Sequence, residues 1–152
     1  MTDTTKPENT APGSTGAKGG TMTARIDHII INVNDYERAC RFYDWLMPKL
    51  GYSAGVHDFD GTRGWAAESG SFWIKKADAR FTSDTFHKDR VGLCEIAFRG
   101  ESRAQIDELA EELEMHGARI LDPPREYDYV PGYYAVFFAD PDGIKLEVVH
   151  IP

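Results

Sequence analysis

The sequence predicts an α+β fold in which two βαβββ modules pair their sheets into a curved, half-open barrel with the helices outside. Two observations predict this fold. A β-branched-rich strand, an amphipathic helix and three short strands follow one another twice along the chain. Aligning the two halves also places Gly51 opposite Gly117 and Gly70 opposite Gly143. An internal repeat of this kind is typical of a duplicated supersecondary unit.

The first module begins with the segment 25–33, RIDHIIINV, which is rich in β-branched residues and predicts a buried strand. Asn34 and Glu37 fit the start of a helix, and apolar residues then recur at helical spacing as far as Gly51. Pro48 should loosen or stop the last turn. Gly-containing breaks then separate three short predicted strands, at 52–59, 63–68 and 71–76.

The second module follows a polar loop at 77–90 and repeats this order. Its first strand is the segment VGLCEIAFRG. Ser102 and Gln105 form a candidate capping box, and the helix that they begin should end at Gly117. The turn sequence DPDG joins the last two of its three further predicted strands, at 119–121, 133–139 and 144–150.

The chain of 152 residues is long enough for one domain with a hydrophobic core, which we expect at 24–152. The modules should cover about 24–78 and about 90–152. The opening segment 1–23 is rich in Thr, Gly, Pro and Lys and has almost nothing to bury, so it predicts a disordered tail or a cloning remnant.

The charge balance excludes some classes of partner. Lys and Arg number 17 against 25 Asp and Glu, and the net charge of -8 would repel nucleic acids and anionic membrane surfaces. No apolar run approaches the length of a membrane span. Cys40 and Cys94 are too few for a disulfide scaffold. We therefore expect a cytoplasmic protein with no nucleic-acid or membrane partner.

Strand alternation aims three polar side chains at one face. In 25–33 the apolar residues on one side suit packing under a helix, which leaves His28 on the other side. The same reasoning points Glu95 and Glu147 toward the concave face of the predicted sheets. Two carboxylates and an imidazole in an apolar groove suit a divalent cation. For any one of them alone, a hydrogen-bonded or partly solvated structural residue is the simpler interpretation.

Three segments carry a resemblance to a known family. The segments RIDHIIINV, VGLCEIAFRG and PGYYAVFFADPDGIKLEVV resemble strands one, five, seven and eight of the vicinal oxygen chelate superfamily. That superfamily includes glyoxalases, bleomycin-resistance proteins and extradiol dioxygenases. The resemblance runs from Arg25 to the C-terminus, and its most specific part is the DPDG turn followed by a strand with a central Glu. It implies metal ligands at His28 and Glu147.

The chain departs from the family pattern at the other two ligand positions. Many relatives have His where this chain has Glu95, and a fourth ligand would fall near Ile74, which has no donor atom. A ring-cleaving dioxygenase is therefore less expected than a glyoxalase-like lyase or isomerase. The cofactor implied is a divalent ion, Mn, Fe, Co, Ni or Zn, or none.

Two functions remain open from the sequence, besides a structural or regulatory domain. In the first, His28, Glu95 and Glu147 hold a metal that polarises a small oxygen-bearing substrate, and Glu95, if it is not a ligand, is the general base. Tyr134 is the candidate acid or hydrogen-bond donor among several nearby tyrosines. In the second, the chain is a metal-free small-molecule-binding protein of the bleomycin-resistance kind. A homodimer is expected in either case.

Overall fold

The computed structural model describes residues 24–152, apart from the side chains of 54–59. The prediction of a tail at 1–23 lies outside the described residues. Within the described part of the chain, no helix is long and apolar enough to cross a membrane.

The first half of the chain forms one four-stranded sheet with the order β1-β4-β3-β2. Strand β1 runs parallel to β4, whereas β3 pairs antiparallel with both β2 and β4. A short 3-10 helix, η1, follows the sheet. The elements are β1 (His28–Val33), α1 (Tyr36–Lys49), β2 (Ser53–Phe59), β3 (Thr62–Ala67), β4 (Gly70–Lys76) and η1 (Ala79–Phe81).

The second half repeats this topology in a second four-stranded sheet with the order β5-β8-β7-β6. Strand β5 is parallel to β8, and β7 is antiparallel to both of its neighbours. The predicted duplication is therefore present in the strand order. The elements are β5 (Ile96–Arg99), α2 (Arg103–Leu113), the 3-10 helix η2 (Glu114–His116), β6 (Arg119–Glu126), β7 (Tyr134–Ala139) and β8 (Lys145–His150).

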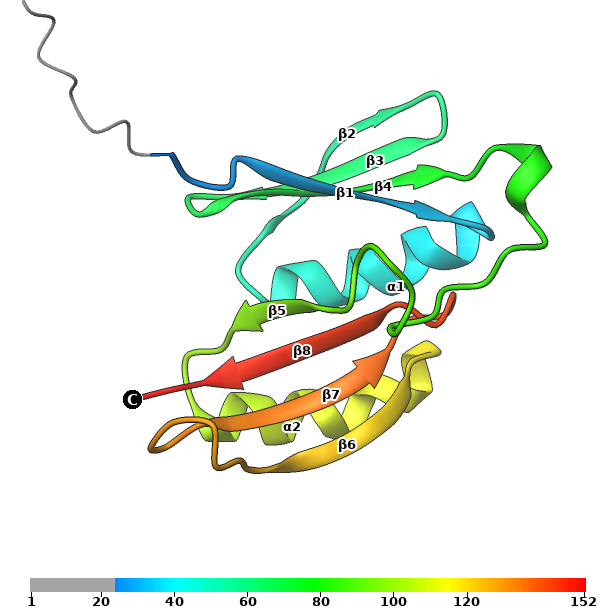
Figure 1. Ribbon diagram of the computed structural model, residues 1–152. Helices are drawn as coiled ribbons and strands as arrows, with labels where there is room; N and C mark the ends of the chain where they lie inside the picture. Colours follow the sequence, from blue (N-terminus) through cyan, green and yellow to red (C-terminus); the bar gives the residue numbers. More distant parts are fainter. Residues whose placement is uncertain (1–23) are drawn as a thin grey trace, which may run out of the picture.

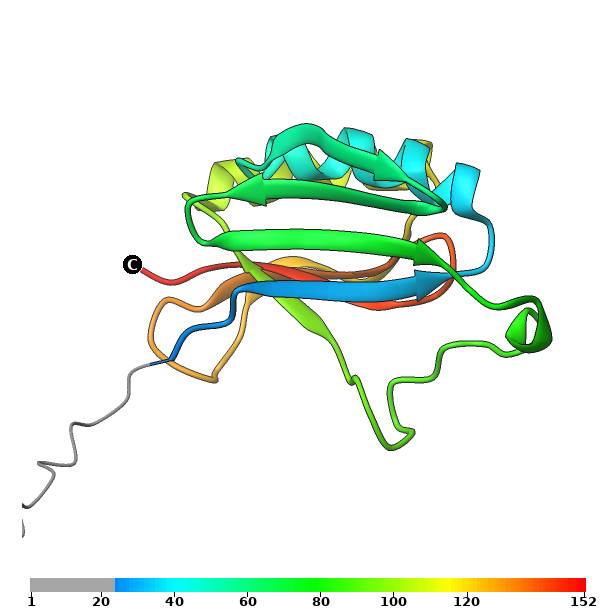
Figure 2. The same cartoon turned by 90° about the horizontal axis from the view of Figure 1, so that it is seen from above.

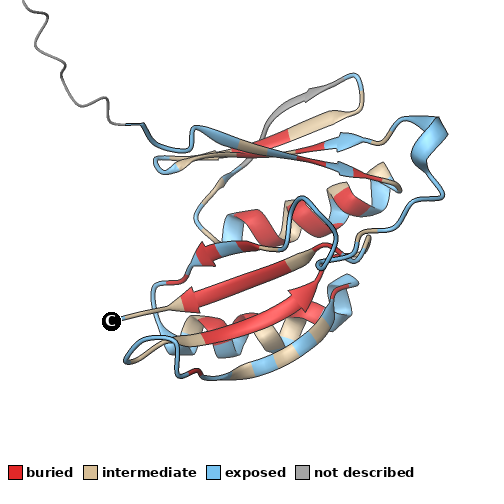
Figure 3. Ribbon diagram, viewed as in Figure 1, coloured by how far each residue is buried: buried red, intermediate tan, exposed pale blue. Residues whose placement is uncertain are grey.

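Helix α1 packs against the first sheet and α2 against the second (Figure 1). Seen from above, both helices lie on the same side of the molecule (Figure 2). One core cluster combines residues of both sheets and both helices, and Figure 3 shows β7 and β8 buried along most of their length. The α+β class with two mixed sheets is thus confirmed, whereas the joining of the sheets into a curved half-open barrel remains a prediction.

The helix starts show one correction to the sequence analysis. Asp35, and not Asn34, caps α1: its carboxylate accepts a hydrogen bond from the backbone N–H of Arg38 at 3.0 Å. The amide of Asn34 is engaged elsewhere, because it donates to the carbonyl oxygen of Asp84. The cap of α2 is Ser102, as predicted.

The two largest differences from the predicted strand boundaries lie in the second half of the chain. Strand β5 begins only at Ile96, so Glu95 lies just before it. Strand β6 continues through Pro123 and Pro124 as far as Glu126. This extension is tolerated because β6 is the edge strand of its sheet, where a proline need not donate to a neighbouring strand.

The DPDG turn between β7 and β8 forms hydrogen bonds with the first half of the chain. Asp140 is 3% exposed and accepts hydrogen bonds from the hydroxyl of Tyr43 on α1 at 2.8 Å and from the backbone N–H of Asp142 and Ile144. Burial raises the pKa of Asp140 to about 6. Asp142 accepts from the guanidinium of Arg38 at 2.9 Å and from a backbone N–H at the end of β1. The turn residues are therefore contacts between the modules.

Gly64 on β3 lies beside the indole of Trp73 on β4, which leaves no room for a side chain at position 64. A Cβ atom added to Gly64 would lie 2.4 Å from Cε3 of that ring. We expect Gly64→Ala to lower the free energy of unfolding by about 1–3 kcal/mol, because the ring must move out of its packed position. Urea unfolding measures this loss. Adding Trp73→Leu should recover part of it, and an unchanged urea midpoint in Gly64→Ala would contradict the packing described.

Candidate functional site

Glu147 is the buried carboxylate of the second sheet. Along β8, Leu146 and Val148 join the main core under the helices, so Glu147 and its neighbours Lys145 and Val149 point to the face away from α2. We call this the site face. Although Glu147 is polar, it is only 2% exposed. Glu147 thus lies on the opposite side of β8 from Leu146 and Val148.

Aromatic side chains surround this carboxylate. A small second cluster on the site face consists of Tyr127, Ala135, Phe137 and Val149, with Tyr133 packed against it. The hydroxyl of Tyr133 donates a hydrogen bond to Oε1 of Glu147. Burial raises the pKa of Glu147 and, together with the neighbouring carboxylate, that of Tyr133. The arrangement favours a Glu147 that holds its proton more tightly than a free carboxyl.

A lysine lies beside both predicted carboxylates. The Lys145 ammonium is 2.6 Å from Oε2 of Glu95, and it also lies 4.6 Å from the ring centroid of Phe137. The positive charge of Lys145 acts on Glu147 as well, against the effect of burial on its pKa. Glu95 and Glu147 are therefore near enough to affect each other's charge, and the cation paired with Glu95 belongs to the chain itself.

His28 lies in a different environment. It begins β1 in the first sheet, its side chain is 56% exposed, and its Nδ1 atom is 2.9 Å from a carboxylate oxygen of Asp27. Among residues 24–152, apart from the side chains left out at 54–59, no three His, Cys, Asp or Glu side chains form a group that could hold a metal ion. His28, Glu95 and Glu147 thus do not form a three-donor group.

Tyr134 faces the helices. It alternates with Val136 and Phe138, which belong to the main core, and its hydroxyl donates to Asp107 of α2 at 2.6 Å. The tyrosine that reaches the buried carboxylate is Tyr133, one residue earlier, and we place Tyr133 in the site instead. Ile74, the position considered for a fourth ligand, is fully buried in the main core.

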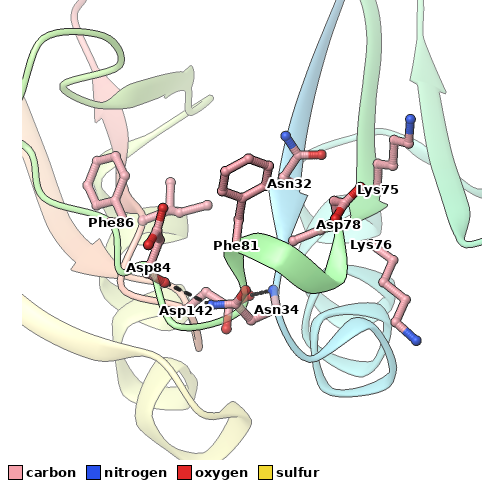
Figure 4. A pocket seen from close by; sticks show the side chains of 11 residues that line it. Asn32, Asn34, Lys75, Lys76, Asp78, Phe81, Asp84, Phe86 and Asp142 are labelled. Carbon is pink, nitrogen blue, oxygen red and sulfur yellow. Dashed lines mark hydrogen bonds between the residues drawn. The ribbon is translucent and has the colours of Figure 1, made fainter.

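A cavity of about 580 Å³ lies where the ends of β1 and β4 meet the β7–β8 turn (Figure 4). The segment that follows β4 forms its outer wall. We call it the junction cavity. It is lined by Asn32, Asn34, Lys75, Lys76, Ala77, Asp78, Phe81, Asp84, Phe86, Asp142 and Ile144. Its volume is within the range of pockets that hold small organic ligands.

The charged groups of the junction cavity are only partly compensated. Asp78 is paired with Arg80, and Asp142 with Arg38. Among the described residues, no ion pair is formed by Lys75, Lys76 or Asp84. The lining side chains without an ion pair are thus two ammonium groups and one carboxylate.

Sequence reasoning missed the junction cavity. Its aromatic residues, Phe81 and Phe86, lie in the loop at 77–90, which the sequence analysis treated only as polar. Phe81 is 53% exposed, so its burial in a core does not explain its presence. Two phenylalanines in an otherwise polar loop were the available signal.

The chain matches known proteins over almost all of its described length. The sequence profile of the Glyoxalase/Bleomycin resistance protein/Dioxygenase superfamily matches residues 25–148. The uncharacterized protein YqjT of Bacillus subtilis (strain 168) is 36% identical over 125 residues, which are 82% of this chain and 97% of the relative.

Solved structures agree with this match. A protein from Bacillus halodurans, provisionally described as a glyoxalase, has a TM-score of 0.72 and 32% identity, covering 83% of this chain and 95% of its own. A glyoxalase/bleomycin resistance protein from Albidiferax ferrireducens T118 has a TM-score of 0.68 and 26% identity, covering 84% of this chain and 98% of its own.

Proposed function

Because the chain belongs to the Glyoxalase/Bleomycin resistance protein/Dioxygenase superfamily, we propose that it is a metal-free member that binds a small organic molecule in the junction cavity. The observation that carries the proposal is the cavity itself, which combines a volume of about 580 Å³ with aromatic side chains and a few polar groups.

The donor atoms of the predicted metal site argue for the metal-free alternative. A divalent ion needs at least three well-placed donors in most protein sites. Here Glu95 is paired with the Lys145 ammonium and Glu147 accepts a hydrogen bond from Tyr133. His28 belongs to the other sheet, where its side chain contacts that of Asp27. The three side chains therefore do not fit a metal centre as they are arranged.

Fragment titration tests the proposal. A mixture of small aromatic compounds is added in the presence of EDTA, and the amide NMR spectrum is followed. We expect shifts at the backbone amides of the cavity wall, around Phe81, Phe86 and Ile144. In Phe81→Ala the shifts should weaken, whereas Tyr129→Ala, a comparable loss of an exposed ring on the site face, should leave them unchanged. A spectrum that no fragment perturbs at these amides would contradict the proposal.

A metal-dependent lyase or isomerase is the competing proposal. It is favoured by one observation, the juxtaposition of Glu95 and Glu147 beside a single cation on the site face. In that account a divalent ion would take the place of the Lys145 ammonium and polarise a substrate oxygen. Stoichiometric metal in the purified wild-type protein, lost in Glu147→Gln, would support it over the metal-free proposal.

A further inference from the structure

We infer that the ligand of the junction cavity is a planar organic anion, of the class of aromatic carboxylates. This inference rests on the proposed function and adds the chemical class of the ligand. It is carried by two features of the cavity, its aromatic wall and the Lys75 ammonium, which forms no ion pair among the described residues.

The aromatic wall consists of two phenylalanines from one loop. Phe86 is half-buried and packs against the main core, so its position is fixed. Phe81 follows Arg80, whose guanidinium lies 5.4 Å from the centroid of the Phe81 ring, and more than half of Phe81 remains exposed. In Figure 4 the two rings lie on the side of the cavity away from β4. A flat apolar ligand can pack closely against these rings. A flexible or strongly hydrated ligand would gain less binding energy from the same contact.

The polar end of the cavity lies on two paired strands. Asn32 of β1 and Lys75 of β4 are register partners. Both are exposed, and in Figure 4 the Asn32 side chain lies beside Phe81 whereas that of Lys75 extends from β4 away from the ring. The Lys75 ammonium supplies a charge and the Asn32 amide a hydrogen-bond donor, which together suit a carboxylate. Lys76 extends to the opposite side and adds to the field at longer range.

Two of the three acidic groups of the cavity are ion-paired. Asp78 pairs with Arg80, and Asp142 pairs with Arg38, which also lies 3.9 Å from Asp35. Asp84 is the remaining acid, and in Figure 4 its carboxylate lies near Phe86, away from Asn32 and Lys75. An anionic head is therefore expected at the Asn32 and Lys75 end, with its apolar body toward the phenylalanines. In a chain with a net charge of -8, an exposed ammonium at this end of the cavity is a basis for selectivity.

Three probes of one shape and different charge test the inference: naphthoate, its neutral methyl ester, and naphthylmethylammonium. Calorimetry in EDTA at low salt should rank naphthoate first, by about five-fold or more over the ester. Equal or tighter binding of the ammonium probe would overturn the inference but leave the proposed function standing. If none of the three probes binds and no fragment shifts the amide signals of the cavity wall, both the inference and the proposed function are overturned.

Charge variants locate the effect. Lys75→Glu should weaken naphthoate about five-fold or more, and Asp84→Asn should strengthen it about two-fold, because each changes the field on the anion. Arg119→Glu makes the same charge change as Lys75→Glu on the edge strand β6 and should leave the affinity unchanged. If Arg119→Glu weakens naphthoate as much as Lys75→Glu does, the net charge of the protein, and not the cavity, selects the anion, and the inference is wrong.

Discussion

Replacing Asp140 with alanine should lower the free energy of unfolding by about 3 kcal/mol or more. The side chain is buried and accepts three hydrogen bonds, one from Tyr43 on the first module and two from the backbone of its own turn. Its removal leaves these donors without a partner. Chemical unfolding at neutral pH measures the loss. The exposed Asp128, replaced in the same way, should change stability by less than about 0.5 kcal/mol. Equal small effects would contradict the role given to Asp140.

Asp140 also predicts a pH dependence of stability. Its pKa is about 6 in the folded chain, against an ordinary value of 3.8. The folded chain therefore binds the proton more tightly, and the stabilisation that this gives is complete below about pH 4 and lost as the pH rises through about 6. The difference corresponds to about 3 kcal/mol. Asp140→Asn, which keeps the shape, should lack this contribution, so that wild type loses stability relative to the variant between these pH values. If the free energies of unfolding of wild type and Asp140→Asn changed with pH in parallel, the raised pKa would not belong to Asp140.

Replacing Lys145 with alanine should turn the site face into a divalent-cation site, because Glu95 and Glu147 can each offer two donor oxygens. Without the ammonium, Glu95 and Glu147 would face each other with no countercharge, and unbound protein should lose about 2–3 kcal/mol of stability. Mn²⁺ should restore part of that loss, because carboxylate oxygens are ligands that such hard ions prefer.

Elemental analysis after exposure to Mn²⁺ and gel filtration measures this gain. We expect no stoichiometric metal in wild type, and a metal content in Lys145→Ala that disappears when Glu147→Gln is added. Lys88→Ala, which removes an exposed lysine paired with Asp89, is the control and should behave as wild type. If wild type binds as much Mn²⁺ as the variant, Lys145 does not take the place of the ion.

The arrangement of the strands could be predicted because the apolar pattern is strong. In β8, alternating Leu146 and Val148 require the helix-covered core, and this alone sends Glu147 to the other face. The repeated strand, helix and turn signals likewise predicted the duplicated topology. The glycine-rich turns and the cap at Ser102 are local signals, and they do not depend on contacts between distant residues.

The candidate site could be predicted only in part, because its chemistry depends on distant contacts. Tyr133 and Tyr134 are consecutive, so their side chains point to opposite faces of the sheet. The sequence alternation could not decide which of the two lies in the site. The pairing of Lys145 with Glu95 joins two strands that are far apart in sequence, and no local pattern indicates it. The junction cavity arises where the loop with Phe81 meets the turn between β7 and β8, which depends on the packing of the modules.

The central claim is that a small ligand binds in the junction cavity without a metal ion. The most direct test measures the affinity of wild type for naphthoate in EDTA and again with an equivalent of Mn²⁺, Ni²⁺ or Zn²⁺. The account predicts the same affinity in all four titrations, and a clear loss in Phe81→Ala. Binding that appears only with a metal, and that depends on Glu147 and not on Phe81, would contradict it and support the metal-dependent enzyme.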